Sequence, residues 1–233
     1  MNNKATGQTE PPDMREPSPI EGSVSTRITY SLRLRGVPPP TLGQIVAVAV
    51  ATAVYTILSW LAIISLPSGI SVVSAVFLAI GFGIPSAIWF GGWAFVIAYI
   101  GNFVGAGLLA GLPLITALPF GTVDLIQLGV PMLLYRLLAR HFGVNPIGKD
   151  VFTVRGFLFF LFCAVLPNNI IGGLYGNIIL IWSGINPPNV LLPGWFAWVA
   201  SNVVVTIVIG SVLLRTLGPV VERFGLTVRN ALS

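Results

Sequence analysis

Asp124 is the one charged residue between Arg35 and Arg136. Hydrophobic residues make up 55% of the chain and charged residues 8%, whereas soluble domains carry about 25% charged residues. Uncharged apolar stretches of this length can span a bilayer, and a chain in lipid must satisfy its backbone polar groups internally, as a helix does. The sequence therefore predicts an all-α, multi-pass protein of the cell membrane.

The basic residues predict how the chain crosses the membrane. All 12 Lys and Arg residues fall into three clusters, at residues 4–35, 136–155 and 215–229. Basic residues next to membrane spans favour the cytoplasmic side, and six spans place all three clusters on that side. The predicted fold is a bundle of six transmembrane helices with both termini in the cytoplasm.

Composition divides the chain into three parts. Residues 1–41 are polar and rich in proline, which predicts a mostly disordered cytoplasmic tail. Residues 42–218 form the predicted six-span domain, and residues 219–233 a short cytoplasmic tail. The spans are expected at residues 43–66, 70–84, 86–110, 120–135, 156–182 and 195–214, and residues 112–120 are interpreted as a short uncharged link.

The boundary between the second and third spans has two candidate positions. Residues 70–111 carry no charge, but as one helix they would extend about 60 Å, twice the hydrocarbon thickness of a bilayer. The chain must therefore fold back inside this run. We expect the reversal at residues 81–86, where glycine and proline are typical of helix ends, and residues 91–92, a glycine pair, are the alternative.

Asp124 is the strongest single indication of a functional site. A carboxylate near the bilayer centre costs about 2.5–3.5 kcal/mol on insertion scales, so such a residue is interpreted as functional by default. Counting residues places Asp124 and Gln127 in the outer part of the fourth span. The alternative interpretation is structural, because an acidic residue near a helix N-terminus is stabilised by about 0.3–1 kcal/mol through the helix dipole.

Polar side chains of neighbouring spans are expected at a similar depth, where they would form a pocket open to the outside. Convergent polar groups in an otherwise apolar pocket are typical of a small-molecule site. The predicted ligand-binding residues are Asn102, Asp124, Gln127, Asn168, Asn169, Asn177, Trp198 and Asn202. Two of these assignments have alternatives: Trp198 could belong to an interfacial aromatic belt with Trp195, and the asparagine pair could repair the helix beside Pro167.

Several functions are excluded or disfavoured by the residues present. His141 is the only histidine and has no cysteine near it, so we expect no transition-metal site and no cofactor. Paired aspartates in facing spans, or a serine with a base, are not found, so the protein is not expected to be an enzyme. No region outside the spans is large enough for a nucleic-acid interface. Cys163 lies in an apolar run and is interpreted as a small hydrophobic residue.

Small residues repeat in the first span. Ala47 and Ala51 are four residues apart, as are Ala49 and Ala53, and this spacing allows close approach of another helix. The approaching helix could belong to a partner protein or to the bundle itself.

The runs LPSGISVVSAVFLAIGFGIPSAIWFGG, GNFVGAGLLAGLP and PFGTVDLIQ resemble the substrate-binding S components of energy-coupling factor (ECF) transporters. The resemblance covers roughly residues 43–218. It implies six helices, cytoplasmic termini and a ligand site near the outer face. It also implies that Ala47, Ala49, Ala51 and Ala53 contact a transmembrane coupling subunit. The implied function is uptake of a small water-soluble nutrient by a protein that is embedded in membrane lipid. The chain has no Walker phosphate loop, so ATP hydrolysis would come from partner ATPases.

A second resemblance gives an alternative function. The GN pair at residues 101–102, Asp124, RLLAR at residues 136–140 and WFAWVASN at residues 195–202 are similar to membrane-associated sensor domains of bacterial signalling proteins. Those domains usually have more spans and a cytoplasmic output domain. This resemblance implies a membrane sensor that binds a small ligand and signals to a separate partner.

Overall fold

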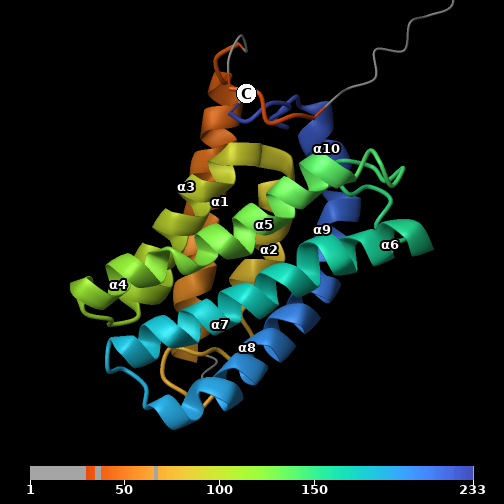
Figure 1. The fold of residues 1–233 in the computed structure, drawn as a ribbon. Helices are drawn as coiled ribbons and strands as arrows, with labels where there is room; N and C mark the ends of the chain where they lie inside the picture. The colour runs from red at the N-terminus through yellow and green to blue at the C-terminus, as the bar shows by residue number, and fades with distance from the viewer. Residues whose placement is uncertain (1–29, 35–37, 66–67, 233) are drawn as a thin grey trace, which may run out of the picture.

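The computed structural model describes residues 30–34, 38–65 and 68–232. Every secondary-structure element within these residues is a helix, which confirms the all-α prediction. Five helical stretches are long and apolar enough to cross a membrane: Leu42–Ser65, Leu78–Leu109, Leu114–Leu138, Val154–Trp182 and Pro188–Arg223. Figure 1 shows these stretches packed side by side as a bundle.

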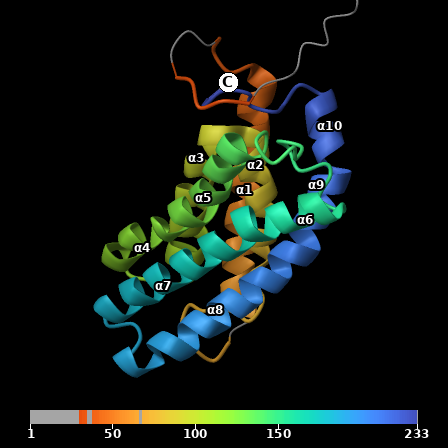
Figure 2. The same cartoon turned by 45° about the vertical axis from the view of Figure 1, so that its right-hand side comes forward.

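The second of these stretches folds back on itself. It consists of α2 (Leu78–Phe90), a 3-10 turn η1 (Gly91–Trp93), α3 (Ala94–Ile100) and the π-helical η2 (Gly101–Leu109). Gly91 has φ +60°, a conformation that favours glycine. Figures 1 and 2 show α2 and α3 side by side and joined at the end near the C-terminus.

The packing of Tyr55 in α1 (Leu42–Ser65) confirms this reversal. Gly83 and Gly101 lie against the same Tyr55 ring, and a Cβ at either glycine would be 2.3 Å from it. In one straight helix the two glycines would be about 27 Å apart, so the chain must reverse between them. The reversal therefore lies at the alternative position, residues 91–92, and the expected break at residues 81–86 was wrong. Gly81 and Gly83 serve packing instead, since Gly81 contacts Ile209 and the helix continues through both.

The predicted link at residues 112–120 was also wrong, because most of it is helical. α4 (Leu114–Gly121) and α5 (Val123–Leu138) follow one another in a single apolar stretch. Pro113 precedes the first turn of α4, a position where the missing N–H of proline has no helical partner to lose. Asp124 consequently lies near the middle of this 25-residue stretch, in the first turn of α5.

The last two stretches run diagonally across the bundle, as Figure 1 shows. The first of them comprises α6 (Val154–Phe160), η3 (Leu161–Val165) and α7 (Leu166–Trp182). The second comprises η4 (Pro188–Val190), α8 (Leu191–Val205), η5 (Thr206–Gly210), α9 (Ser211–Thr216) and α10 (Gly218–Arg223). The second extends beyond the predicted span at both ends.

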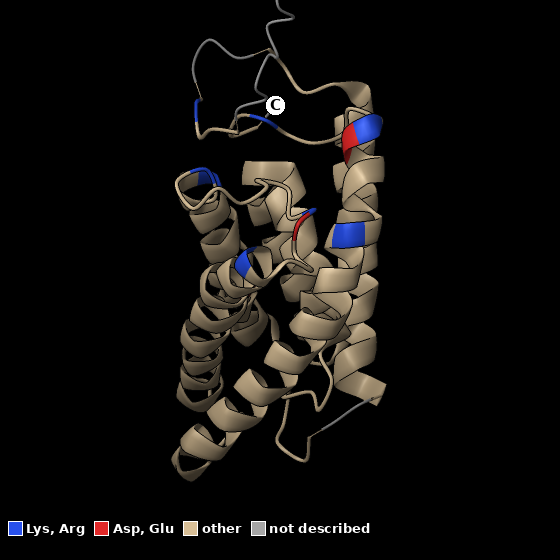
Figure 3. Cartoon of the chain, turned by 90° about the vertical axis from the view of Figure 1, so that its right-hand side faces the viewer, with Lys and Arg blue, Asp and Glu red and all other residues tan. Residues whose placement is uncertain are grey.

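Figure 3 shows the coloured Lys, Arg, Asp and Glu segments gathered toward the end that carries the C-terminus, and we call it the charged end. Arg136 lies there at the end of α5. Its guanidinium donates to four backbone carbonyls, those of Ser31 (3.0 Å), Val228 (2.6 Å), Arg229 (3.2 Å) and Asn230 (2.7 Å). One side chain thus connects segments from both ends of the chain to the bundle.

The structure describes part of each predicted tail, and these parts lie at the charged end. Residues 1–29 and 35–37 of the predicted disordered tail lie outside the described residues. Tyr30 is buried, and the Ser31 N–H donates to the Arg229 carbonyl at 2.7 Å. Val228, in the predicted C-terminal tail, is fully buried and donates to the Trp89 carbonyl at 2.8 Å. The described parts of both tails therefore pack on the bundle.

Candidate functional site

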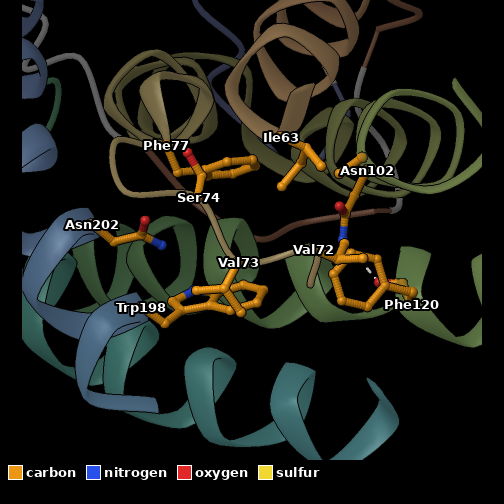
Figure 4. Close-up of a pocket in the computed structure, with 10 residues that line it drawn as sticks. Ile63, Val72, Val73, Ser74, Phe77, Asn102, Phe120, Trp198 and Asn202 are labelled. Carbon is orange, nitrogen blue, oxygen red and sulfur yellow. Dashed lines mark hydrogen bonds between the residues drawn. The ribbon is translucent and has the colours of Figure 1, made fainter. Parts of the chain in front are cut away.

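A small pocket lies between the helices at the end of the bundle opposite the charged end. We call it the capped pocket (Figure 4). Ten residues line it: Ile63, Val72, Val73, Ser74, Phe77, Asn102, Ala106, Phe120, Trp198 and Asn202. Its volume is about 10 Å³, which is room for a single water molecule. Three of the eight predicted ligand-binding residues, Asn102, Trp198 and Asn202, therefore face one cavity.

The segment before α2 closes this pocket, with Val72 and Val73 pointing into it (Figure 4). Three hydrogen bonds anchor the segment to other parts of the bundle. Ser74 Oγ donates to the Ala62 carbonyl (2.9 Å), the Phe77 N–H to Ser201 Oγ (3.3 Å), and Asn186 Nδ2 to the Ser71 carbonyl (3.0 Å).

The backbone of this cap is strained at one residue. Val72 has φ +60°, and it is the one non-glycine residue with positive φ in the described part of the chain. A β-branched side chain in this conformation is a genuine outlier, and strain of this kind costs about 1–3 kcal/mol. The surrounding hydrogen bonds must therefore hold the cap in its closed position.

A buried polar network lies directly behind the pocket, in the middle of the bundle. Tyr55 in α1 donates its hydroxyl proton to Asp124 Oδ2 at 2.6 Å. With its amide nitrogen facing Asp124, Gln127 donates to Oδ1 at 2.7 Å, and its oxygen accepts from Trp198 Nε1 (3.0 Å) and Asn202 Nδ2 (3.1 Å). The network thus joins Asp124 to two residues that line the pocket.

The Gln127 amide orientation is inferred from its neighbours. The opposite orientation makes one bond, from Gln127 Nε2 to Asn169 Oδ1 at 3.2 Å, and turns the amide oxygen toward the Asp124 carboxylate. We favour the first orientation because it satisfies the carboxylate and two further donors. Asp124 then has two hydrogen-bonding side chains, and no Lys or Arg forms an ion pair with it among the described residues.

Tyr55 is the functional candidate that sequence reasoning missed. A tyrosine inside an apolar span carries a polar group that needs a partner, and this signal was present in the first span. Its ring fits between helices because Gly83 and Gly101 have no side chains. The pairing with Asp124 depends on the fold, because the Tyr55 ring passes between α2 and η2 to reach α5.

The remaining predicted amides bond to backbone groups. Asn102 Nδ2 donates to the Phe120 carbonyl (2.8 Å) and so joins η2 to α4 at the pocket wall. Asn168 Nδ2 donates to the Gln127 carbonyl (3.0 Å), and Asn169 Nδ2 to the Val165 carbonyl (2.7 Å). These two flank the network and do not line the pocket. All three amides are buried.

Asn177 lies apart from the site. Its Nδ2 donates to the Gly173 carbonyl at 2.8 Å. Its Oδ1 lies against Gly194, where a Cβ would be only 2.3 Å away. Asn177 therefore packs α7 against α8, and the structure does not bring it to the pocket.

The four alanines of the first span divide between two faces of α1. Ala51 is buried in the core and Ala47 is half-buried, whereas Ala49 and Ala53 are exposed. The exposed face also carries Val46, Val50 and Ile57. A partner could reach the second pair of alanines but not Ala51.

Acidic, histidine and cysteine side chains do not cluster in groups of three or more within the described residues. Comparison with protein-family models, with curated proteins and with solved structures finds no match for this chain.

Proposed function

We propose that the protein is an integral membrane substrate-binding subunit for uptake of a small water-soluble nutrient. One observation carries the proposal: polar side chains from α1, α5 and α8 form one hydrogen-bonded network that includes a buried carboxylate, next to a capped pocket. Buried polar groups of this kind in a membrane span are expensive and are usually functional. The ligand would enter from the end opposite the charges.

The lining of the pocket suggests the class of ligand. Phe77, Phe120 and Trp198 supply flat aromatic surfaces, and the amides of Asn102 and Asn202 supply directional polar groups. A planar, vitamin-like molecule with polar substituents fits such a wall. Because the closed pocket holds about one water molecule, binding requires the cap at residues 68–77 to move outward.

Six membrane crossings follow from this proposal. The α2 and α3 arms count as two crossings, since the chain reverses at Gly91. The charged end then faces the cytoplasm by the positive-inside rule. Cysteines at Gly69 and Gly184, in a Cys163→Ser background, should react with an impermeant thiol reagent added outside cells, and a cysteine at Gly143 should not. Labelling at Gly143 would contradict this topology.

Energy for uptake would come from a transmembrane coupling subunit and ATPases on other chains. The exposed pair Ala49 and Ala53 on α1 is the proposed contact. Replacing both with leucine should abolish co-purification of the coupling subunit without unfolding the protein, because neither side chain is buried. If binding of that subunit persists, the contact lies elsewhere.

The direct test is native mass spectrometry of the protein purified from its own membranes, with a retained small molecule as the expected result. Trp198→Phe removes the donor to Gln127 and should lower retention. Trp195→Phe is the matched control, because Trp195 Nε1 donates to the Ile170 carbonyl outside the pocket. Equal retention by the two variants would contradict the assignment of the pocket.

A membrane sensor is the second candidate, and one observation favours it. α5 carries Asp124 in the network and Arg136 at the charged end, where Arg136 binds both terminal segments. A ligand that shifts α5 would therefore move the parts of the chain that face a cytoplasmic partner. Neighbouring genes for a coupling subunit and ATPases would favour uptake, whereas a kinase or cyclase gene would favour sensing.

A further inference from the structure

An open apolar groove lies at the charged end, between the end of α5 and the start of α6, away from the capped pocket. Its volume is about 340 Å³. One guanidinium interrupts an otherwise apolar lining, which consists of Phe142, Arg155, Leu158, Phe159, Phe162 and Cys163. We propose that this groove binds one anionic phospholipid, with its phosphate on Arg155 and an acyl chain along the aromatic floor.

One face of α6 and η3 builds the groove. Arg155, Phe159 and Phe162 follow at intervals of four and three residues, so their side chains lie on the same side of the helix. Phe162 lies about 10 Å farther along the helix axis than Arg155. Phe159 packs between Tyr135 and Phe142, with ring centroids 5.0 and 5.7 Å away, and forms a fixed floor.

Arg155 lines the groove with an exposed side chain, next to Gly143. Gly143 has φ +60°, and a Cβ there would lie 3.0 Å from Arg155 Nη1. Arg155 makes no hydrogen bond or ion pair with any residue that the structure describes. Asp150, the closest acid in sequence, accepts from the Asn145 N–H at 2.8 Å instead. The guanidinium is thus available to an external anion.

The arrangement of one guanidinium followed by aromatic rings matches the phosphate and acyl chains of a phospholipid. A soluble anion would pair with Arg155 but leave the exposed Phe162 ring uncovered, and a purely apolar molecule would leave the charge unmatched. A phospholipid satisfies both, because its phosphate lies at the membrane surface and its chains run inward. The exposed Arg140, two residues before Phe142, adds a second positive charge close in sequence to the groove lining. Basic pockets of this kind on the cytoplasmic side favour acidic headgroups.

The test is lipid retention by the full chain in phosphatidylcholine nanodiscs that contain a minor fraction of phosphatidylglycerol with the same acyl chains. Native mass spectrometry should find one retained phosphatidylglycerol in preference to phosphatidylcholine. Arg155→Gln should lower that affinity about five-fold, since a basic residue near an anionic surface contributes about 1 kcal/mol. Arg223→Gln removes the same charge from an exposed site at the same end, outside the groove, and should leave retention unchanged.

Two further arms separate a lipid from other occupants. Phe162→Ser keeps the charge but removes part of the floor, and it should also lower phosphatidylglycerol retention. Equal retention of both lipids, or wild-type retention by Arg155→Gln, would overturn the proposal. Displacement of the lipid by millimolar inorganic phosphate would identify a simple anion site. A protein that co-purifies through Arg155, without any lipid preference, would identify a protein interface. Either result would overturn the phospholipid proposal. Thermal melts in pure phosphatidylcholine check that every variant folds.

Discussion

Asp124 and Arg136 lie on the same helix, and both are buried, but they are satisfied by different kinds of partner. Asp124 is bound by the side chains of Tyr55 and Gln127. Arg136 is bound by four backbone carbonyls of the terminal segments. Side chains can rotate away and exchange a partner for a ligand, whereas carbonyls of a packed segment move only if that segment unfolds. We therefore expect Asp124 to serve ligand binding and Arg136 to hold the fold together.

The largest effect is expected from Arg136→Gln. This substitution removes the guanidinium donor from the buried Val228 carbonyl and from three partly buried carbonyls. A buried polar group left without a partner costs about 1–3 kcal/mol, so the free energy of unfolding should fall by about 3 kcal/mol. Thermal melts in detergent measure the change, with Arg223→Gln as the exposed control. A melting temperature equal to that of the control would show that the terminal segments are held by other contacts.

Asp124→Asn tests the other half of the comparison. It keeps the shape and one acceptor oxygen but removes the charge, so ligand affinity should fall by about 1.5–3 kcal/mol, the range for a charged hydrogen bond. The melting temperature should change little, because Tyr55 retains an acceptor. Calorimetric binding and a melt on the same sample separate the two effects. An unchanged dissociation constant would make Asp124 a structural residue.

Tyr55→Phe should have a smaller effect of the same kind. It removes one donor to the carboxylate, and the net contribution of such a bond is about 0.5–1.5 kcal/mol for neutral pairs and more for charged ones. Because the two residues share one bond, the loss should be smaller in an Asp124→Asn background. Additive losses in this double-mutant cycle would mean that the residues act independently.

Asn177→Ala should change least. Asn177 bonds within its own helix and lies away from the pocket, so ligand affinity should remain at the wild-type value. Loss of one hydrogen bond should reduce stability by about 1 kcal/mol. A clear loss of affinity would extend the binding site toward the contact between α7 and α8.

The structure brings some of the predicted site residues together and separates others. Asp124, Gln127, Trp198 and Asn202 were expected together, and the structure joins them in one network. The position of Asp124 along its apolar stretch was less predictable, because the stretch formed by α4 and α5 starts at Leu114, six residues before the predicted span. Two prolines lie in the predicted link, but Pro113 precedes α4 and Pro119 lies within it.

Composition and charge alone determined that the chain is helical and apolar enough to cross a membrane. This follows because lipid leaves the backbone only internal hydrogen-bond partners, and because apolar runs and basic clusters are local properties of the sequence. Tertiary structure decided where the chain reverses and which side chains meet. Gly81 and Gly91 are equally permissive, and only the packing of Ile209 on the first and the turn at the second distinguish them. The Tyr55 and Asp124 pair likewise joins two residues 69 positions apart in the sequence, a separation over which no local pattern carries information.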